Sequence, residues 1–127
     1  MDIQKQIEYW KNTGADDIVT AEVLLHNGRL LPCLFFCHLC IEKMIKAHVV
    51  RCTNEVPPKV HNLSYLLEKT DLILTEEQML FCDTLMYYQL ECRYPEYFPK
   101  VPTKAVSKSI LKKTKEFQKW LQTKLLK

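Results

Sequence analysis

The sequence holds only two glycines in 127 residues, and it lacks any long apolar run. No Gly-rich loop is present, and no stretch is dominated by the alternation of apolar and polar residues that is typical of strands. No segment approaches the roughly 18 to 20 consecutive apolar residues that a membrane span requires. These absences argue against a β-rich fold and against a transmembrane protein, and they leave a pattern that is helical nearly throughout.

The sequence also lacks the features of a secreted or metal-binding chain. The first residues, Met1–Gln6, are polar and have no apolar signal-peptide core, so we expect a cytoplasmic protein. In a reducing cytoplasm its six cysteines are expected to pack as small apolar residues. Cys33, Cys37 and Cys40 share one helical face, and Cys37 and Cys40 form a single Cys-x2-Cys pair. No second pair accompanies it, and we expect these cysteines to pack rather than to bind zinc. We expect no metal and no cofactor.

What is present is enough for one domain, covering residues 1–127 without a linker or an internal repeat. Apolar residues make up 47% of the chain, which excludes a disordered protein. A chain of this length buries roughly two thirds of its unfolded surface and needs neither metal nor disulfide to fold. The predicted fold is all-α, an antiparallel up-and-down four-helix bundle with one additional short helix.

Local signals set the expected helix limits. Asn27-Gly28 ends the first helix, Pro32 suits the first turn of the second, and Thr75 with Gln78 forms a capping box. Gly14 is a candidate break in the first helix. Three prolines keep residues 93–102 out of a helix, and Thr103 then caps the last helix. The predicted helices cover residues 3–26, 32–51, 62–69, 75–91 and 103–125, with the third short one added to the bundle.

A polar stripe marks the second predicted helix. His38, Glu42 and Lys46 follow one another at four-residue spacing, which places them on one helical face, about one turn apart. The residues between them are mostly apolar, so the helix is expected to be largely buried. A buried helix that keeps a charged seam must satisfy those charges, either in an internal ion network or at a site.

Three short segments then resemble the HEPN family (higher eukaryotes and prokaryotes nucleotide-binding). They are His-x3-Glu-x3-Lys-Ala from His38, Pro-x2-His-Asn-Leu-x2-Leu-Leu from Pro58, and Arg-Tyr-Pro from Arg93, in that order. The resemblance implies a small helical domain that pairs as a homodimer. It also implies a groove that holds nucleotide or RNA, and pairing with a minimal nucleotidyltransferase in a toxin–antitoxin system.

The ribonuclease motif of that family, Arg-x4–6-His, would begin at Arg93. No histidine occurs after His61, so the catalytic histidine of the motif is missing. We therefore expect a non-catalytic domain that binds nucleotide or RNA. Two alternatives stay open: a metal-independent ribonuclease that uses a different acid–base residue, such as His38 or His61, and a purely structural dimeric protein.

The loop after the fourth helix is the predicted ligand site. Arg93 can hold a phosphate in a bidentate manner, Lys46 and Lys100 can add charge, and Tyr94, Tyr97 and Phe98 can stack on a base. A structural interpretation competes, in which Arg93 pairs with Glu42 or Glu91 and the aromatic residues close the end of the bundle. His61 and Asn62 have a structural interpretation too, since Asn62 is a good helix N-cap.

The charge is unevenly distributed. Residues 1–103 hold 10 Lys and Arg against 14 Asp and Glu, a balance of −4, whereas residues 104–127 hold 8 Lys against one Glu, a balance of +7. The last helix is thus a basic rod that could contact phosphates, or simply a solvated face.

The second helix is apolar on so many faces that one bundle core cannot cover all of them. We expect a partner subunit to cover the remaining apolar surface.

Overall fold

A computed structural model describes residues 1–91 and 101–126 of the chain. This part of the chain is all-helical, without strands, as predicted. Its elements are α1 (Ile3–His26), α2 (Leu30–Thr53), α3 (Leu63–Leu67), α4 (Glu76–Glu91) and α5 (Lys104–Leu125).

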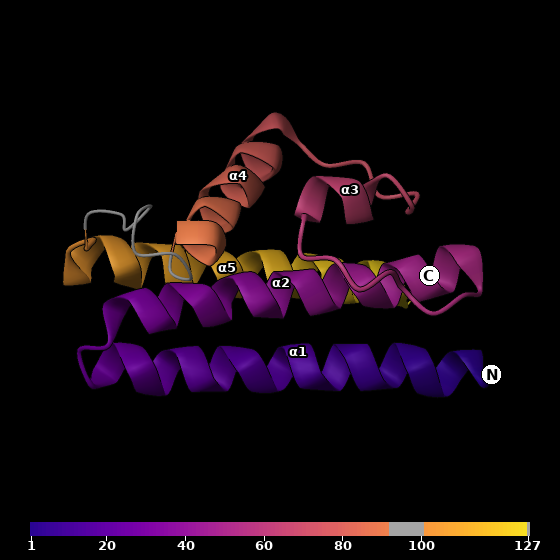
Figure 1. The fold of residues 1–127 in the computed structure, drawn as a ribbon, viewed down its shortest axis with the longest axis horizontal. Helices are drawn as coiled ribbons and strands as arrows, with labels where there is room; N and C mark the ends of the chain where they lie inside the picture. Colours follow the sequence, from indigo (N-terminus) through magenta and orange to yellow (C-terminus); the bar gives the residue numbers. More distant parts are fainter. Residues whose placement is uncertain (92–100, 127) are drawn as a thin grey trace.

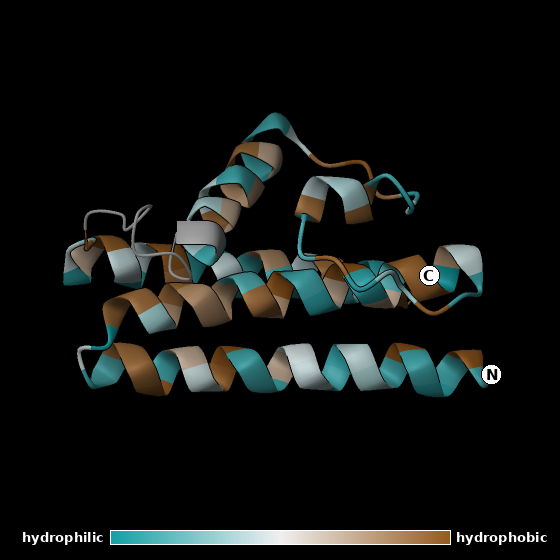
Figure 2. Cartoon of the chain, in the orientation of Figure 1, coloured by the Kyte–Doolittle hydropathy of each residue, from teal (hydrophilic) through white to brown (hydrophobic). Residues whose placement is uncertain are grey.

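The arrangement centres on α2, which packs against α1, α3, α4 and α5. In Figure 1, α1, α2 and α5 lie along one another, and the four long helices alternate in direction along the chain. α4 departs from an ideal bundle because it crosses the others obliquely, and α3 lies beside it. The N-terminal half of α2 is mostly hydrophobic in Figure 2. The up-and-down order is therefore present, but it is wrapped around one central helix.

The predicted helix caps are confirmed. Thr75 and Gln78 bond reciprocally, with Thr75 Oγ1 accepting from the Gln78 amide at 3.1 Å and Gln78 Oε1 accepting from the Thr75 amide at 2.9 Å. Asn62 Oδ1 accepts the Tyr65 amide at the start of α3, and Thr103 Oγ1 accepts the Val106 amide at the start of α5. Side-chain oxygens thus satisfy amides that the first helical turn leaves without partners.

The two glycines behave differently from each other. Gly28 has φ of +73°, the left-handed conformation that ends α1 where predicted. The predicted break at Gly14 is wrong, because α1 runs unbroken from Ile3 to His26. A Cβ at Gly14 would lie 3.1 Å from the backbone oxygen of Cys40. Gly14 therefore lets α1 approach α2 closely.

The surplus apolar faces of α2 are covered by the chain itself. Fourteen of the 24 residues of α2 are buried, including Cys33, Cys37 and Cys40, which lie in the hydrophobic core. Burial also raises the pKa of the Cys40 thiol, which keeps it protonated. Since other helices of the same chain cover α2, its composition no longer requires a partner subunit, and dimerisation stays a prediction.

Within the described residues, no helix combines the length and the apolar character needed to cross a membrane.

Candidate functional site: a buried seam that holds an exposed imidazole

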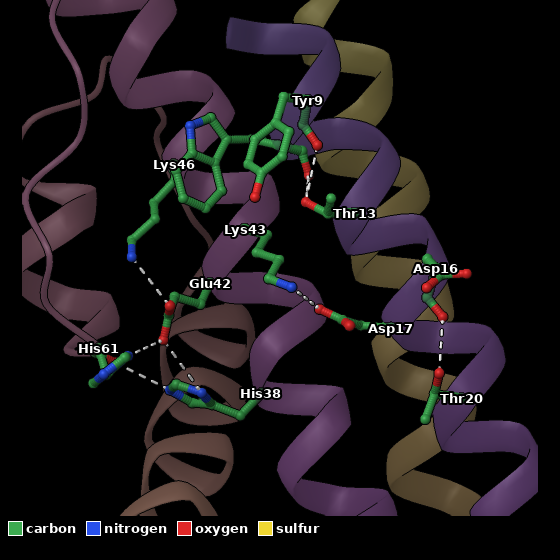
Figure 3. A network of polar contacts seen from close by, with 11 residues as sticks. Tyr9, Thr13, Asp16, Asp17, Thr20, His38, Glu42, Lys43, Lys46 and His61 are labelled. Atoms are coloured by element: carbon green, nitrogen blue, oxygen red, sulfur yellow. Dashed lines mark hydrogen bonds and ion pairs between the residues drawn. The ribbon is translucent and has the colours of Figure 1, made fainter.

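The predicted seam lies on one face of α2, and it is buried. His38, Glu42 and Lys46 have exposed fractions of 0%, 3% and 5%. Figure 3 shows their side chains along α2, with Glu42 between the other two. The four-residue spacing thus brings the three groups together as expected, in a place where charges need partners.

Glu42 is the centre of the network. Its Oε2 accepts a hydrogen bond from Lys46 Nζ at 3.2 Å, and its Oε1 accepts one from His61 Nδ1 at 2.9 Å. Both oxygens of the carboxylate therefore have a partner, one on its own helix and one from the loop before α3. A predicted pairing of Glu42 with Arg93 would have to compete with these two contacts.

His38 holds the same loop through its backbone. His38 Nε2 lies 3.1 Å from the carbonyl oxygen of His61, so this ring nitrogen donates to it, and His38 Nδ1 lies 3.7 Å from Glu42 Oε1. Two residues one turn apart on α2 thus hold His61 in place. His38 bonds the backbone carbonyl of His61, and Glu42 bonds its side chain. His61 itself keeps a side-chain exposed fraction of 44%.

This geometry decides which nitrogen of His61 remains for chemistry. Because the Glu42 carboxylate can only accept, Nδ1 of His61 carries the proton. Nε2 is then an acceptor in the neutral ring and a donor in the charged ring. Within the described residues, Nε2 has no hydrogen-bond partner. The imidazole is held in one orientation and presents a nitrogen that can bind a phosphate oxygen or move a proton.

Lys46 lies in a setting that favours structure over ligand binding. Its ammonium bonds Glu42 and also lies 5.2 Å from the ring centroid of Trp10, on α1. A phosphate could reach Lys46 only if this side chain gave up one of the two contacts. The assignment of Lys46 to a ligand site remains a prediction.

The predicted residues Arg93, Tyr94, Tyr97, Phe98 and Lys100 lie outside the described part of the chain. The helix that leads to them is nevertheless tied to the His61 region. The backbone amide of Leu63, two residues after His61, donates to Met86 Sδ on α4 at 3.3 Å.

A second polar cluster was not predicted from the sequence. His48, fully buried on α2, donates from Nε2 to the Leu121 carbonyl of α5 at 2.8 Å, and its Nδ1 accepts from Arg51 Nη2 at 2.8 Å. Arg51 in turn pairs with Asp71 at 2.6 Å. Burial lowers the pKa of His48, so the ring is neutral and joins α2 to α5. No short-range pattern in the sequence could have indicated a contact between residues 48 and 121.

A second charged pair lies on another face of α2, where Lys43 Nζ contacts Asp17 of α1 at 2.8 Å (Figure 3). Burial raises the pKa of Asp17, and the ammonium of Lys43 works in the opposite direction. Together with Gly14, this pair fixes α1 against the helix that carries the seam.

The family model of the HEPN domain matches residues 7–124, which is nearly the whole chain. The chain belongs to the HEPN domain family. No curated protein and no solved structure matches it.

Membership confirms the resemblance inferred from the three short segments. Two of them, around His38 and His61, meet in space through Glu42. Sequence reasoning singled out both segments, but it did not predict their direct contact.

Proposed function

We propose that this HEPN domain binds nucleotide or RNA at the surface where His61 is exposed, as a non-catalytic module. The proposal rests on two hydrogen bonds that orient His61, one from its imidazole to Glu42 and one from His38 to its carbonyl oxygen. A phosphate oxygen is the ligand atom that an oriented imidazole, in its charged form, binds best.

The cost of this arrangement supports a functional role. Burying a carboxylate and an ammonium is expensive, and replacing such a pair with apolar residues is often neutral or stabilising. A loop that only had to be attached to α2 could be held by backbone bonds and by Leu63, which is already fully buried. Orientation of the one exposed member of the network is what the buried charges add.

The loop that begins after α4 completes the proposed site. Arg93 and Lys100 would contact the phosphates, and Tyr94 and Tyr97 would stack on a base.

Acid–base catalysis is the second candidate, and one observation favours it. A carboxylate that accepts from Nδ1 of a histidine leaves Nε2 as a base, the arrangement used in many hydrolytic enzymes. His61 with Glu42 has this form, although the family's Arg-x4–6-His motif is incomplete. In this mechanism His61 Nε2 would remove the proton of a ribose 2′-hydroxyl, whose oxygen would attack the adjacent phosphorus. The 5′-oxygen of the next nucleotide would leave and take a proton from water, and Arg93 would stabilise the charge on the phosphate.

The proposal includes the partners that the family implies. They are a second copy of the chain and a minimal nucleotidyltransferase of a toxin–antitoxin pair, in the cytoplasm. Apolar side chains around the start of α4 offer a surface for a protein partner, since Ile73, Met79 and Leu80 are 88%, 52% and 60% exposed.

The test measures binding of nucleoside monophosphates and of a 20-residue oligouridine to the wild type and to His61→Ala. Ser64→Ala, an exposed neutral change on α3, is the matched control. We expect His61→Ala to weaken binding by tenfold or more at a temperature well below its melting point, and the control to bind as the wild type does. The melting temperature of His61→Ala should fall, because Glu42 Oε1 loses its partner. Equal binding by all three proteins would refute the proposal.

The same proteins separate binding from catalysis. Purified protein is incubated with the oligouridine in a chelator, and the products are separated by size. Intact RNA is the expected result. Cleavage that disappears in His61→Ala but not in Ser64→Ala would replace the binding function with the ribonuclease function.

A further inference from the structure

A second basic feature of the molecule lies away from His61, on α5. The helix advances 100° per residue, so five of its lysines fall within an arc of roughly 80° and follow a line about 22 Å long. These five residues, the lysine stripe, are Lys104, Lys108, Lys112, Lys115 and Lys119.

The stripe borders a groove between the end of α1 and the first half of α5. The groove has a volume of about 780 Å³. Its apolar lining comes from Leu25 of α1 and from Ala105 and Leu111 of α5, and the first four lysines of the stripe line it as well. His26, exposed in the last turn of α1, adds a titratable group.

Negative charge in the groove is limited to one residue of those lining it, Glu22. Its carboxylate is ion-paired with Lys115. Among the described residues, no carboxylate pairs with Lys104, Lys108 or Lys112. Within residues 1–91 and 101–126, three cations therefore stand in line along the groove without an internal counter-charge.

The placement of these cations is unfavourable for the isolated helix. Lys104, Lys108 and Lys112 follow at four-residue spacing, where like charges repel each other. Lys104 also lies in the first turn of α5, where the helix dipole favours negative charge. A solvated face would be more stable with glutamate at one of these positions. A bound anion would reverse both penalties.

We propose that the lysine stripe and the α1–α5 groove bind the phosphate backbone of a single RNA strand, without reading its sequence. A single row of ammonium groups fits a single row of phosphates, and the groove lining includes no Phe, Tyr or Trp side chain on which a base could stack. The inference deepens the proposed function and rests on it. The seam lies between α2 and α3, so the stripe is a separate contact surface for a longer RNA.

A membrane surface fits this helix less well. Amphipathic helices that bind membranes insert large apolar side chains beside their basic residues. The apolar stripe of α5, which includes Ile110, Phe117 and Leu121, is buried in the core instead. The lysines remain, and these suit a ligand that is bound through its charges.

The experiment measures the affinity of a labelled 20-residue oligouridine as a function of salt concentration. The groove variant carries Lys104→Gln, Lys108→Gln and Lys112→Gln. The control variant carries the same loss of charge at exposed lysines elsewhere, Lys5→Gln, Lys69→Gln and Lys113→Gln. Melting temperatures verify that both variants fold.

We expect the slope of log K against log salt to fall by about 2 in the groove variant, since each lost phosphate contact on a single strand contributes roughly 0.7. The control variant should keep most of the slope. Equal losses in the two variants would overturn the proposal, because they would show a dependence on net charge alone.

Two further arms separate this inference from the proposed function. If His61→Ala abolishes binding while the groove variant keeps the full slope, the stripe is refuted and the His61 site stands. If the groove variant loses its slope while His61→Ala binds normally, the stripe stands and the His61 site is refuted. Absence of RNA binding by the wild type, with or without lysine-dependent binding to phosphatidylserine vesicles or polyglutamate, overturns the stripe proposal.

Discussion

The seam on α2 and the lysine stripe on α5 both contain several charged side chains, but the two regions differ in the burial and in the pairing of those charges. In the seam, Glu42 is buried and each of its oxygens has a fixed partner. On the stripe, Lys104 and Lys108 are exposed and lie next to like charges. The buried charges of the seam lower the folding stability and fix one orientation of His61. The lysines of the stripe remain exposed to a ligand. We therefore expect substitutions in the seam to change folding, and substitutions in the stripe to change binding to anions.

The largest effect should come from Glu42→Ala. Removal of this carboxylate leaves the buried ammonium of Lys46 without its counter-charge, which costs about 3 to 5 kcal/mol in comparable pairs. Urea denaturation measures the loss. Glu116→Ala on the exposed side of α5 is the control and should change the free energy of unfolding by less than about 0.5 kcal/mol.

The double variant Glu42→Leu with Lys46→Met tests whether the loss of stability in Glu42→Ala comes from the unpaired charge of Lys46. With both charges removed, most of the stability should return, because an apolar pair fills the space without an unpaired charge. The orientation of His61 would still be lost, and so would the proposed ligand binding. A double variant as unstable as Glu42→Ala would show that stability depends on the seam for reasons other than its charge.

An intermediate effect is expected at His48, whose buried ring is neutral between Leu121 and Arg51. The folded protein holds the pKa of His48 below the ordinary value of 6.5, so the unfolded chain takes up a proton first as the pH falls. The contribution of the neutral ring is complete above about pH 6.5 and is lost as the pH falls through the folded pKa.

His48→Gln tests this dependence, because an amide can donate to Leu121 and accept from Arg51 without titrating. Stability curves of the wild type and the variant, measured from pH 7.5 down to 4.5, should converge by at most about 1.4 kcal/mol per pH unit. The other histidines and Asp17 are common to both proteins and cancel in the difference. Parallel curves would show that His48 does not control this part of the pH profile.

The smallest effect, and the one of opposite sign, is expected on the stripe. Lys108→Glu should stabilise the fold by about 0.2 to 1 kcal/mol, since it replaces repulsion from Lys104 and Lys112 with attraction at four-residue spacing. It should weaken RNA binding at the same time. Thermal melts at low salt detect the gain, which should fade at high salt. A destabilised Lys108→Glu would contradict the account of the stripe.

The contrast also explains how far the sequence could predict the structure. Local signals predicted what depends on neighbouring residues, including the limits of α1, the caps at Thr75 and Thr103, and the common face of His38 and Glu42. The placement of Gly14 was misjudged because its role depends on the approach of α2, which is a tertiary contact.

The same limit applies to the candidate site. His61 and Glu42 are 19 residues apart, and a pattern in either segment cannot reveal that the loop before α3 folds back on α2. The link between His48 and Leu121 spans 73 residues and was missed entirely. The sequence led us to predict that a second subunit covers the apolar faces of α2. Composition alone does not distinguish a neighbouring helix of the same chain from a helix of a partner subunit.

The central claim, that the buried seam orients His61 for a phosphate, is tested most directly by the ring nitrogens themselves. In ¹⁵N-labelled protein, long-range correlation spectra follow each histidine while uridine monophosphate or oligouridine is added. The account predicts a change at Nε2 of His61, with Nδ1 still bound to Glu42 and the signals of His48 unchanged. RNA binding that leaves both nitrogens of His61 unaffected would contradict it.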